Sequence, residues 1–174
     1  MDDCLGKIPG TLSMEAIALR GAARTPKPSI LVNFRSFDTG CGNPTACGAE
    51  LADTGLQQKQ RMHGSFSCAD TYNTMAAIGL DFKRDYEDLA PASNADVAVT
   101  IAKVLKLKLS TQGKLVGRVL NEALLTRPDS VQYKSFTLKS PSAANGLKTI
   151  LKYQTVGKTR YFDVAGFPGR TLGL

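Results

Sequence analysis

The chain lacks tryptophan, contains a single histidine, His63, and has only 7% aromatic residues among its 174. Aliphatic side chains must therefore supply most of the hydrophobic core. One imidazole also excludes a complete two-metal centre of the usual histidine-containing kind in this chain alone. No apolar run approaches the ~18 residues that a membrane-spanning helix requires, so we expect no membrane partner.

The N-terminal residues lack the pattern of a secretory signal peptide, because Met1 is followed by Asp2 and Asp3 and no apolar stretch comes after them. They leave the localisation of this chain undetermined. The length fits one domain of ordinary size. A hydrophobic content of 43% and a charged content of 21% are typical of globular proteins.

Basic residues outnumber acidic ones, 22 against 15, which gives a net charge of +7. Such an excess favours anionic partners. The basic residues are dispersed, however, and are densest in 103–108 (Lys-Val-Leu-Lys-Leu-Lys) and in the C-terminal segment. This dispersal is typical of a solvated basic surface.

Two of the four cysteines, Cys41 and Cys47, bracket a Gly/Pro loop. Their spacing is loose for a zinc site and favours a disulfide, with a pair of reduced thiols as the other possibility. Neither reading identifies a catalytic group.

Hydrophobic patterning predicts helices over 13–20, 95–106 and 116–125. Ser93 or Asn94 is the natural N-cap of the second, and Asp96 follows in its first turn. Val97, Ile101, Val104 and Leu105 recur at helical spacing, which predicts that this helix packs on the core.

Strands are predicted over 29–34, 74–78, 131–138, 150–156 and 159–164, the last two joined by a Gly157-Lys158 turn. The change of character after Pro128 divides the chain into 1–127 and a β-rich extension, 128–174. The extension is too small in apolar surface to fold alone.

The most distinctive stretch is 62–71, Met-His-Gly-Ser-Phe-Ser-Cys-Ala-Asp-Thr, followed by 75–83, Met-Ala-Ala-Ile-Gly-Leu-Asp-Phe-Lys. Asn94-Ala95-Asp96 and Gly117-Arg118 come later in the same order. This arrangement resembles the C-terminal part of the alkaline phosphatase superfamily, in its type I phosphodiesterase/nucleotide pyrophosphatase branch. The resemblance covers roughly residues 60 to 125.

The resemblance implies an α/β fold, part of an alkaline-phosphatase-like layered sheet with the β-rich extension added. It implies a two-metal zinc site to which His63 contributes one ligand, a phosphate-ester substrate, and a periplasmic or secreted location for full-length members. The nucleophile and most of the metal ligands have no counterpart here. We therefore expect a fragment of a metal-dependent phosphate-ester hydrolase that is inactive alone, with no catalytic residue and His63 as its metal ligand. For Asp53, Asp70 and Asp81, which lie near His63 in sequence, we expect structural roles.

Two other functions compete with this one. Asp38-Thr39-Gly40 and Asp53-Thr54-Gly55 carry the tripeptide of aspartic proteases, but their separation of 15 residues matches neither layout of those enzymes, and turn chemistry explains them better. A non-enzymatic module that binds nucleic acid or another polyanion is suggested by the charge and by four aromatics among the basic residues of the extension. Nucleic acid is the less favoured partner, and the oligomeric state is open. Those aromatics are Tyr133, Tyr153, Tyr161 and Phe162.

Overall fold

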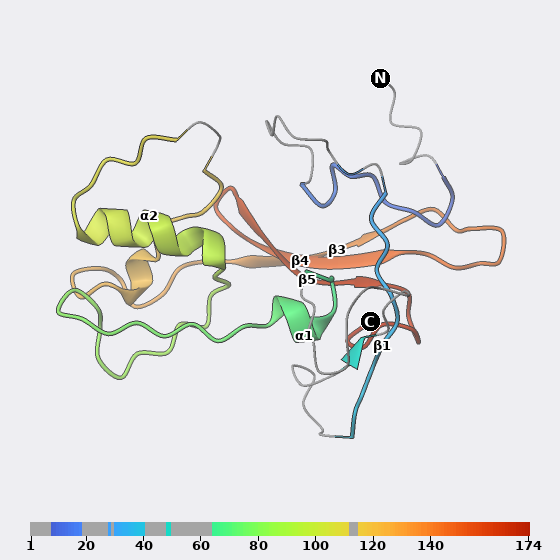
Figure 1. The fold of residues 1–174 in the computed structure, drawn as a ribbon, viewed down its shortest axis with the longest axis horizontal. Coiled ribbons are helices and arrows are strands. Elements are labelled where there is room, and N and C mark those ends of the chain that lie inside the picture. The colour runs from blue at the N-terminus through green and yellow to red at the C-terminus, as the bar shows by residue number, and fades with distance from the viewer. Residues whose placement is uncertain (1–7, 19–27, 29, 41–47, 50–63, 112–114) are drawn as a thin grey trace, which may run out of the picture.

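A three-stranded antiparallel sheet forms the centre of the molecule (Figure 1). The computed structural model describes residues 8–18, 28, 30–40, 48–49, 64–111 and 115–174. Strands β3 (Lys134–Lys139), β4 (Ile150–Val156) and β5 (Thr159–Gly166) lie in the order β3-β4-β5. Gly157 and Lys158 join β4 to β5, and Gly157 adopts the positive φ of +57° that such a turn needs. The predicted hairpin is confirmed.

The core lies against the middle of this sheet. Leu151 of β4 and Val164 of β5 are 0% and 2% exposed. The free edge of β5 is covered by the segment before α1, because the backbone N–H of Ala165 donates to the carbonyl of Phe66 at 3.0 Å. The side-chain amide of Asn33 bridges these two segments, since it donates to the Ala165 carbonyl at 2.7 Å and accepts from the Phe66 N–H at 2.9 Å.

Short elements cover one face of the sheet. Helix α1 (Cys68–Thr71) begins at Ser67, whose side chain accepts from the N–H of Ala69, and it packs against β5. Burial raises the pKa of the Cys68 thiol, which donates to the carbonyl of Leu172 in the C-terminal turn. Strands β1 (Ser36–Phe37) and β2 (Gly48–Ala49) pair antiparallel with each other.

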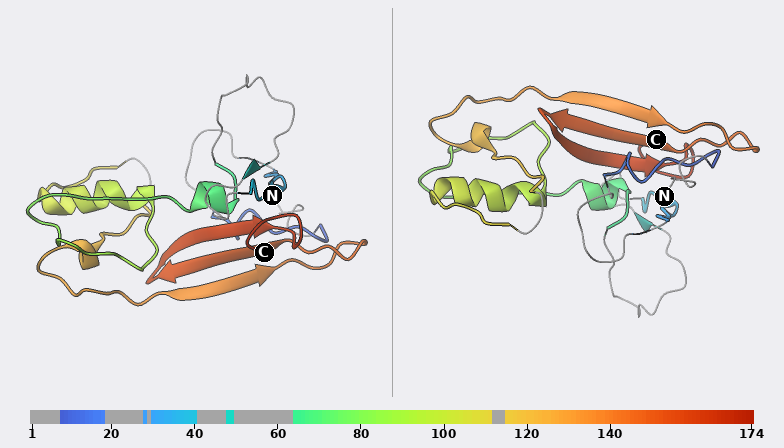
Figure 2. Two further views of the ribbon diagram at one scale, coloured as in Figure 1. Left: turned by 90° about the horizontal axis from the view of Figure 1, so that it is seen from below. Right: turned by 90° about the horizontal axis from the view of Figure 1, so that it is seen from above.

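Helix α2 (Asn94–Val104) lies beyond one end of the sheet and not across its face, as the views of Figure 2 show. It begins with a capping box, in which Ser93 accepts from the start of the helix and Asp96 accepts from the N–H of Ser93. The predicted helix over 95–106 is confirmed to within two residues at each end.

The predicted burial of its apolar stripe is wrong. Val97, Ile101 and Leu105 are 38%, 48% and 59% exposed and Val104 is half-buried, while Asp96 and Thr100 are 0% and 4% exposed. Helical periodicity locates an apolar face but does not say which face the rest of the chain will cover. Here polar contacts from the other side of the helix determine its orientation.

Other local predictions also fail. Residues 30–34, the described part of the strand expected over 29–34, and residues 74–78 are not strands, because no partner strand pairs with them among the described residues. Residues 14–18 form turns where a helix was expected. The helix expected over 116–125 is reduced to the 3-10 turn η3 (Asn121–Ala123). Residues 81–83 run beside it, with the N–H of Lys83 bonded to the carbonyl of Ala123 and the N–H of Leu125 bonded to that of Asp81. These non-local bonds replace those of a continued helix.

The fold is mixed, with helices and a strand-rich C-terminal part, which agrees with the predicted class in its coarse sense. In the described part of the chain, no helix combines the length and apolarity needed to cross a membrane.

Candidate functional site

An aromatic row crosses one face of the sheet. Phe136, Tyr153 and Phe162 lie directly opposite one another on β3, β4 and β5. The rings of Phe136 and Tyr153 stack, with centroids 5.2 Å apart and planes 16° apart, whereas Tyr153 and Phe162 meet edge to face at 6.5 Å. Phe66 extends the row past β5, with its ring 5.6 Å from that of Phe162. At the β3 end of the row the ring of Phe136 is open to solvent, since Phe136 is 41% exposed.

Cations lie beside this row on the same face. Lys134, Thr155 and Arg160 form the next cross-strand row, two residues along each strand, and side chains two residues apart share a face. The guanidinium of Arg160 lies over the ring of Tyr153, 4.6 Å from its centroid. It also donates to the carbonyl of Ala16 at 2.8 Å. Lys134 and Arg160 are both exposed, so their charges reach solvent next to the rings. We call Lys134, Phe136, Tyr153, Arg160 and Phe162 the aromatic-basic face.

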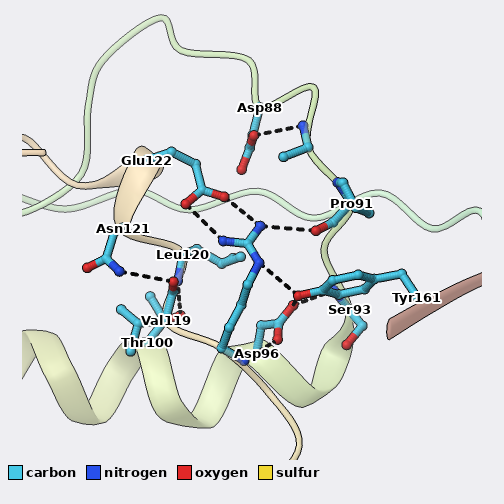
Figure 3. A network of polar contacts seen from close by, with 12 residues as sticks. Asp88, Pro91, Ser93, Asp96, Thr100, Val119, Leu120, Asn121, Glu122 and Tyr161 are labelled. Carbon is cyan, nitrogen blue, oxygen red and sulfur yellow. Dashed lines mark hydrogen bonds and ion pairs between the residues drawn. The ribbon is translucent and has the colours of Figure 1, made fainter. Parts of the chain in front are cut away.

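A second polar cluster lies at the other side of the molecule, where α2 meets η3 and β5 (Figure 3). Arg118 forms a bidentate ion pair with Glu122, with nitrogen–oxygen distances of 2.9 and 2.5 Å. Its Nε donates to the Tyr161 hydroxyl at 2.8 Å and its Nη2 to the Pro91 carbonyl at 3.0 Å. The Tyr161 hydroxyl donates in turn to Asp96 at 3.0 Å.

The charged groups of this cluster pair with one another. Burial alone would raise the pKa of Glu122, but the hydrogen bond and charge of Arg118 more than offset this and leave it below its usual value. Burial and the nearby Glu122 raise the pKa of Asp88. A cavity of about 390 Å³ lies beside Arg118, Glu122, Ser130 and Val156. Because the Arg118 guanidinium is held by three partners, it is not available to bind an anion in that cavity, and we assign the cluster a structural role.

Several residues predicted from the sequence to form or border a site lie outside the described residues. They are His63, the predicted zinc ligand, together with Asp53, Cys41 and Cys47. Within the described part of the chain, no three His, Cys, Asp or Glu side chains come together as a metal ion would require. The zinc site at His63 therefore stays a prediction.

The described candidates have local structural roles. Asp70 accepts a hydrogen bond from the N–H of Ser65 at 2.8 Å. Asp81 is exposed and contributes its backbone carbonyl to Leu125. The Asp38 carboxylate accepts from the N–H of Gly40 at 2.8 Å, which is the turn chemistry expected of its Asp-Thr-Gly tripeptide.

Sequence reasoning found only part of the aromatic-basic face. Tyr153 and Phe162 were among the four aromatics singled out, but Tyr161 points to the opposite side and is buried against Asp96. Phe136 was missed, although it shares a face with Lys134 and Leu138 in the predicted strand. The signal that identifies it is the strand register, which aligns it with Tyr153.

Comparison with known proteins identifies no relative. No protein-family model, no curated protein and no solved structure matches the chain.

Proposed function

We propose that this protein is a non-enzymatic binding module that holds single-stranded nucleic acid on the aromatic-basic face. The observation that carries the proposal is the stack of the exposed Phe136 ring on the half-buried Tyr153 ring, with the Arg160 guanidinium over Tyr153. Bases of any sequence stack on aromatic rings, and neighbouring cations hold the phosphates between them.

The distribution of charge supports this assignment. Lys134 and Arg160 lie on the two outer strands of the row next to the rings, so a backbone that follows this row would meet a cation at each of its ends. The net charge of +7 adds a long-range attraction for a polyanion. Recognition through stacking and phosphate contacts predicts little base specificity.

Cross-strand aromatic pairs also stabilise sheets, and that role alone would explain the row. A structural role requires neither two cations in the neighbouring row nor a half-exposed ring on the edge strand. Phe136 stands at 41% exposure and Arg160 is exposed. These two features favour a ligand over a purely structural use.

The test is fluorescence anisotropy with a labelled single-stranded oligonucleotide over a series of salt concentrations. We expect binding that weakens steeply with salt. F136A and K134Q should each weaken it about tenfold, the order expected for loss of one stacked base or one phosphate contact. K139Q is the matched control, because Lys139 ends the same strand on its other face and should have little effect.

Equal losses in K134Q and K139Q would show that charge alone drives binding, and the assignment of the face would fail. The phosphodiesterase resemblance, its layered sheet and its zinc site make a different prediction in the same assay. They require metal-dependent binding or hydrolysis of a phosphate ester, abolished by H63A. Such activity in the isolated chain, without oligonucleotide binding, would replace our proposal.

A further inference from the structure

Part of the aromatic-basic face lies beside a segment from the N-terminal part of the chain. We call residues 8–18 the N-terminal strap. Figure 1 shows the strap above the sheet and α1 below it. Arg160, a member of the face, donates from Nη1 to the backbone carbonyl of Ala16 at 2.8 Å. Leu151, two residues before Tyr153 and on the same side of β4, is 0% exposed, so this side of the sheet is covered there.

One end of the strap is fixed to the loop between β3 and β4. The N–H of Gly10 donates to the carbonyl of Pro141 at 2.9 Å, and the Gly10 carbonyl accepts from the Thr149 hydroxyl at 2.5 Å. Gly10 is buried with a φ of +87°, and a Cβ there would lie 2.8 Å from the Cβ of Ala143. The backbone of the strap therefore packs tightly at this position, which makes Gly10 a firm anchor.

The other end of the strap forms a strained turn. The N–H of Ala16 donates to the carbonyl of Ser13 at 3.0 Å, and the N–H of Ala18 donates to that of Glu15 at 3.1 Å, so both bonds stay within the strap. Ala18 has a φ of +57°, in the left-handed region that is unfavourable for an L-residue with a side chain. The hydrogen bond from Arg160 connects this turn to β5. This end of the strap therefore separates from the sheet at a lower cost than the end at the anchor.

The contact at this end uses a group that the proposed ligand also needs. The Arg160 guanidinium lies over the Tyr153 ring, and one of its nitrogens is bonded to the Ala16 carbonyl. A phosphate oxygen accepts from a guanidinium as a carbonyl does, and it forms the stronger bond because it is charged. Glu15, the one charged residue in the sequence of the strap, is exposed next to Ala16 and repels an approaching phosphate.

We propose that the N-terminal strap is an autoinhibitory segment, closed through the hydrogen bond between Arg160 and Ala16 and displaced when a phosphate of nucleic acid binds Arg160. The inference rests on the proposed function of the aromatic-basic face. Because the strap stays anchored at Gly10, its opening frees the guanidinium without detaching the whole segment. Nucleic acid binds the open form, so the closed form lowers the apparent affinity in proportion to its population.

The first experiment compares variants of the full chain by fluorescence anisotropy with a labelled single-stranded oligonucleotide. A18P cannot adopt the positive φ and loses the N–H that is bonded to Glu15, so the strap should open. Binding should become about tenfold tighter, the order set by one hydrogen bond from a charged group. A18G adopts the positive φ without strain, so the strap should close more firmly and binding should become about threefold weaker. A77P is the matched control, because it places the same proline in the exposed segment 74–78, and it should leave the affinity unchanged.

A second measurement follows the strap itself. A glutamate-specific endopeptidase cleaves after Glu15 faster when the strap is open, and mass spectrometry identifies the fragment that ends there. Cleavage should be faster in A18P than in wild type without any ligand. A saturating oligonucleotide should accelerate cleavage of wild type, because a ligand that binds the open form shifts the strap toward that form.

The two measurements separate the strap from the site. If the oligonucleotide binds but A18P and A18G have the affinity of wild type, if A77P gains as much as A18P, or if the oligonucleotide slows cleavage after Glu15, the strap proposal is wrong and the proposed function stands. If neither wild type nor A18P binds the oligonucleotide, both proposals are wrong. Binding detected in A18P alone would support both, with the strap closed in nearly all wild-type molecules.

Discussion

The hydroxyl of Tyr161 on β5 donates a hydrogen bond of 3.0 Å to Oδ2 of Asp96 on α2, across 65 residues of sequence. The same hydroxyl accepts from Nε of Arg118 at 2.8 Å. One phenol therefore connects the sheet, the helix and the segment that leads to η3. Because Asp96 also fixes the orientation of α2, this contact links the position of the sheet to the exposure of the helix stripe.

Removing that hydroxyl should destabilise the fold. Y161F leaves the Asp96 carboxylate and the Arg118 guanidinium each without one buried partner, and we expect a loss of about 1–3 kcal/mol in the free energy of unfolding. Urea denaturation measures it. Y133F is the control, since Tyr133 is 44% exposed, and it should change the stability little. Equal effects in the two variants would contradict the linking role of Tyr161.

The same residue predicts a loss of stability in alkali. Burial and the neighbouring Asp96 raise the pKa of Tyr161 above its ordinary value of 10.0. The folded state therefore binds the proton more tightly than the unfolded state, so the contribution is complete below pH 10.0 and is lost as the pH rises beyond it. Denaturation midpoints of wild type should fall more steeply above this pH than those of Y161F. Parallel curves would contradict the prediction.

Asp88 provides a prediction of the opposite kind, a stabilising substitution. Burial and the charge of Glu122 raise its pKa above the usual 3.8, so its ionised form opposes folding at neutral pH. D88N removes the charge and keeps the oxygen that accepts from the N–H of Ala90. We expect a higher melting temperature at pH 7, with the gain shrinking as the pH falls toward 3.8, where wild-type Asp88 becomes protonated. A gain independent of pH would point to another cause.

Gly117 should tolerate no side chain. In G117A the added Cβ would meet backbone atoms of Ala95 at 2.0 and 2.5 Å, which a rotamer change cannot relieve. Separating α2 from residues 117–120 should cost about 1–3 kcal/mol or more. G146A is the control because its Cβ would meet open space, although Gly146 has a φ of +81°. It should cost only the left-handed backbone strain of about 1–2 kcal/mol, and a greater loss in G146A than in G117A would count against the close packing.

The Thr100 hydroxyl can be tested almost without changing shape. T100V replaces it by a methyl group and leaves the buried N–H of Leu120 unpaired, which should cost about 1–3 kcal/mol. T137V makes the same replacement on the exposed strand β3 and should be nearly neutral or slightly stabilising. Thermal unfolding of both variants measures the difference, and equal melting temperatures would show that the hydroxyl does not anchor α2.

The sequence alone determined those features whose causes are local. The capping box at Ser93 and Asp96 begins α2 within its own first turn. The two-residue turn Gly157-Lys158 places the two alternating segments beside each other, where they pair as β4 and β5. Both features were predictable because the groups that form hydrogen bonds with each other lie within a few residues in the sequence. The turn at Asp38 follows for the same reason.

Only the tertiary structure decided which side of α2 is buried and which rings form the aromatic-basic face. The first depends on bonds from Asp96 and Thr100 to residues about 20 positions away. The second depends on a register that brings Phe136 opposite Tyr153. Apolar periodicity favoured burying Val97, Ile101 and Leu105, but leaving buried backbone N–H groups unpaired costs more than exposing part of three aliphatic side chains. The hydrogen-bond partners that decide this balance, the N–H groups of Arg118 and Leu120, lie far from α2 in the sequence, so the sequence of the helix alone does not reveal them.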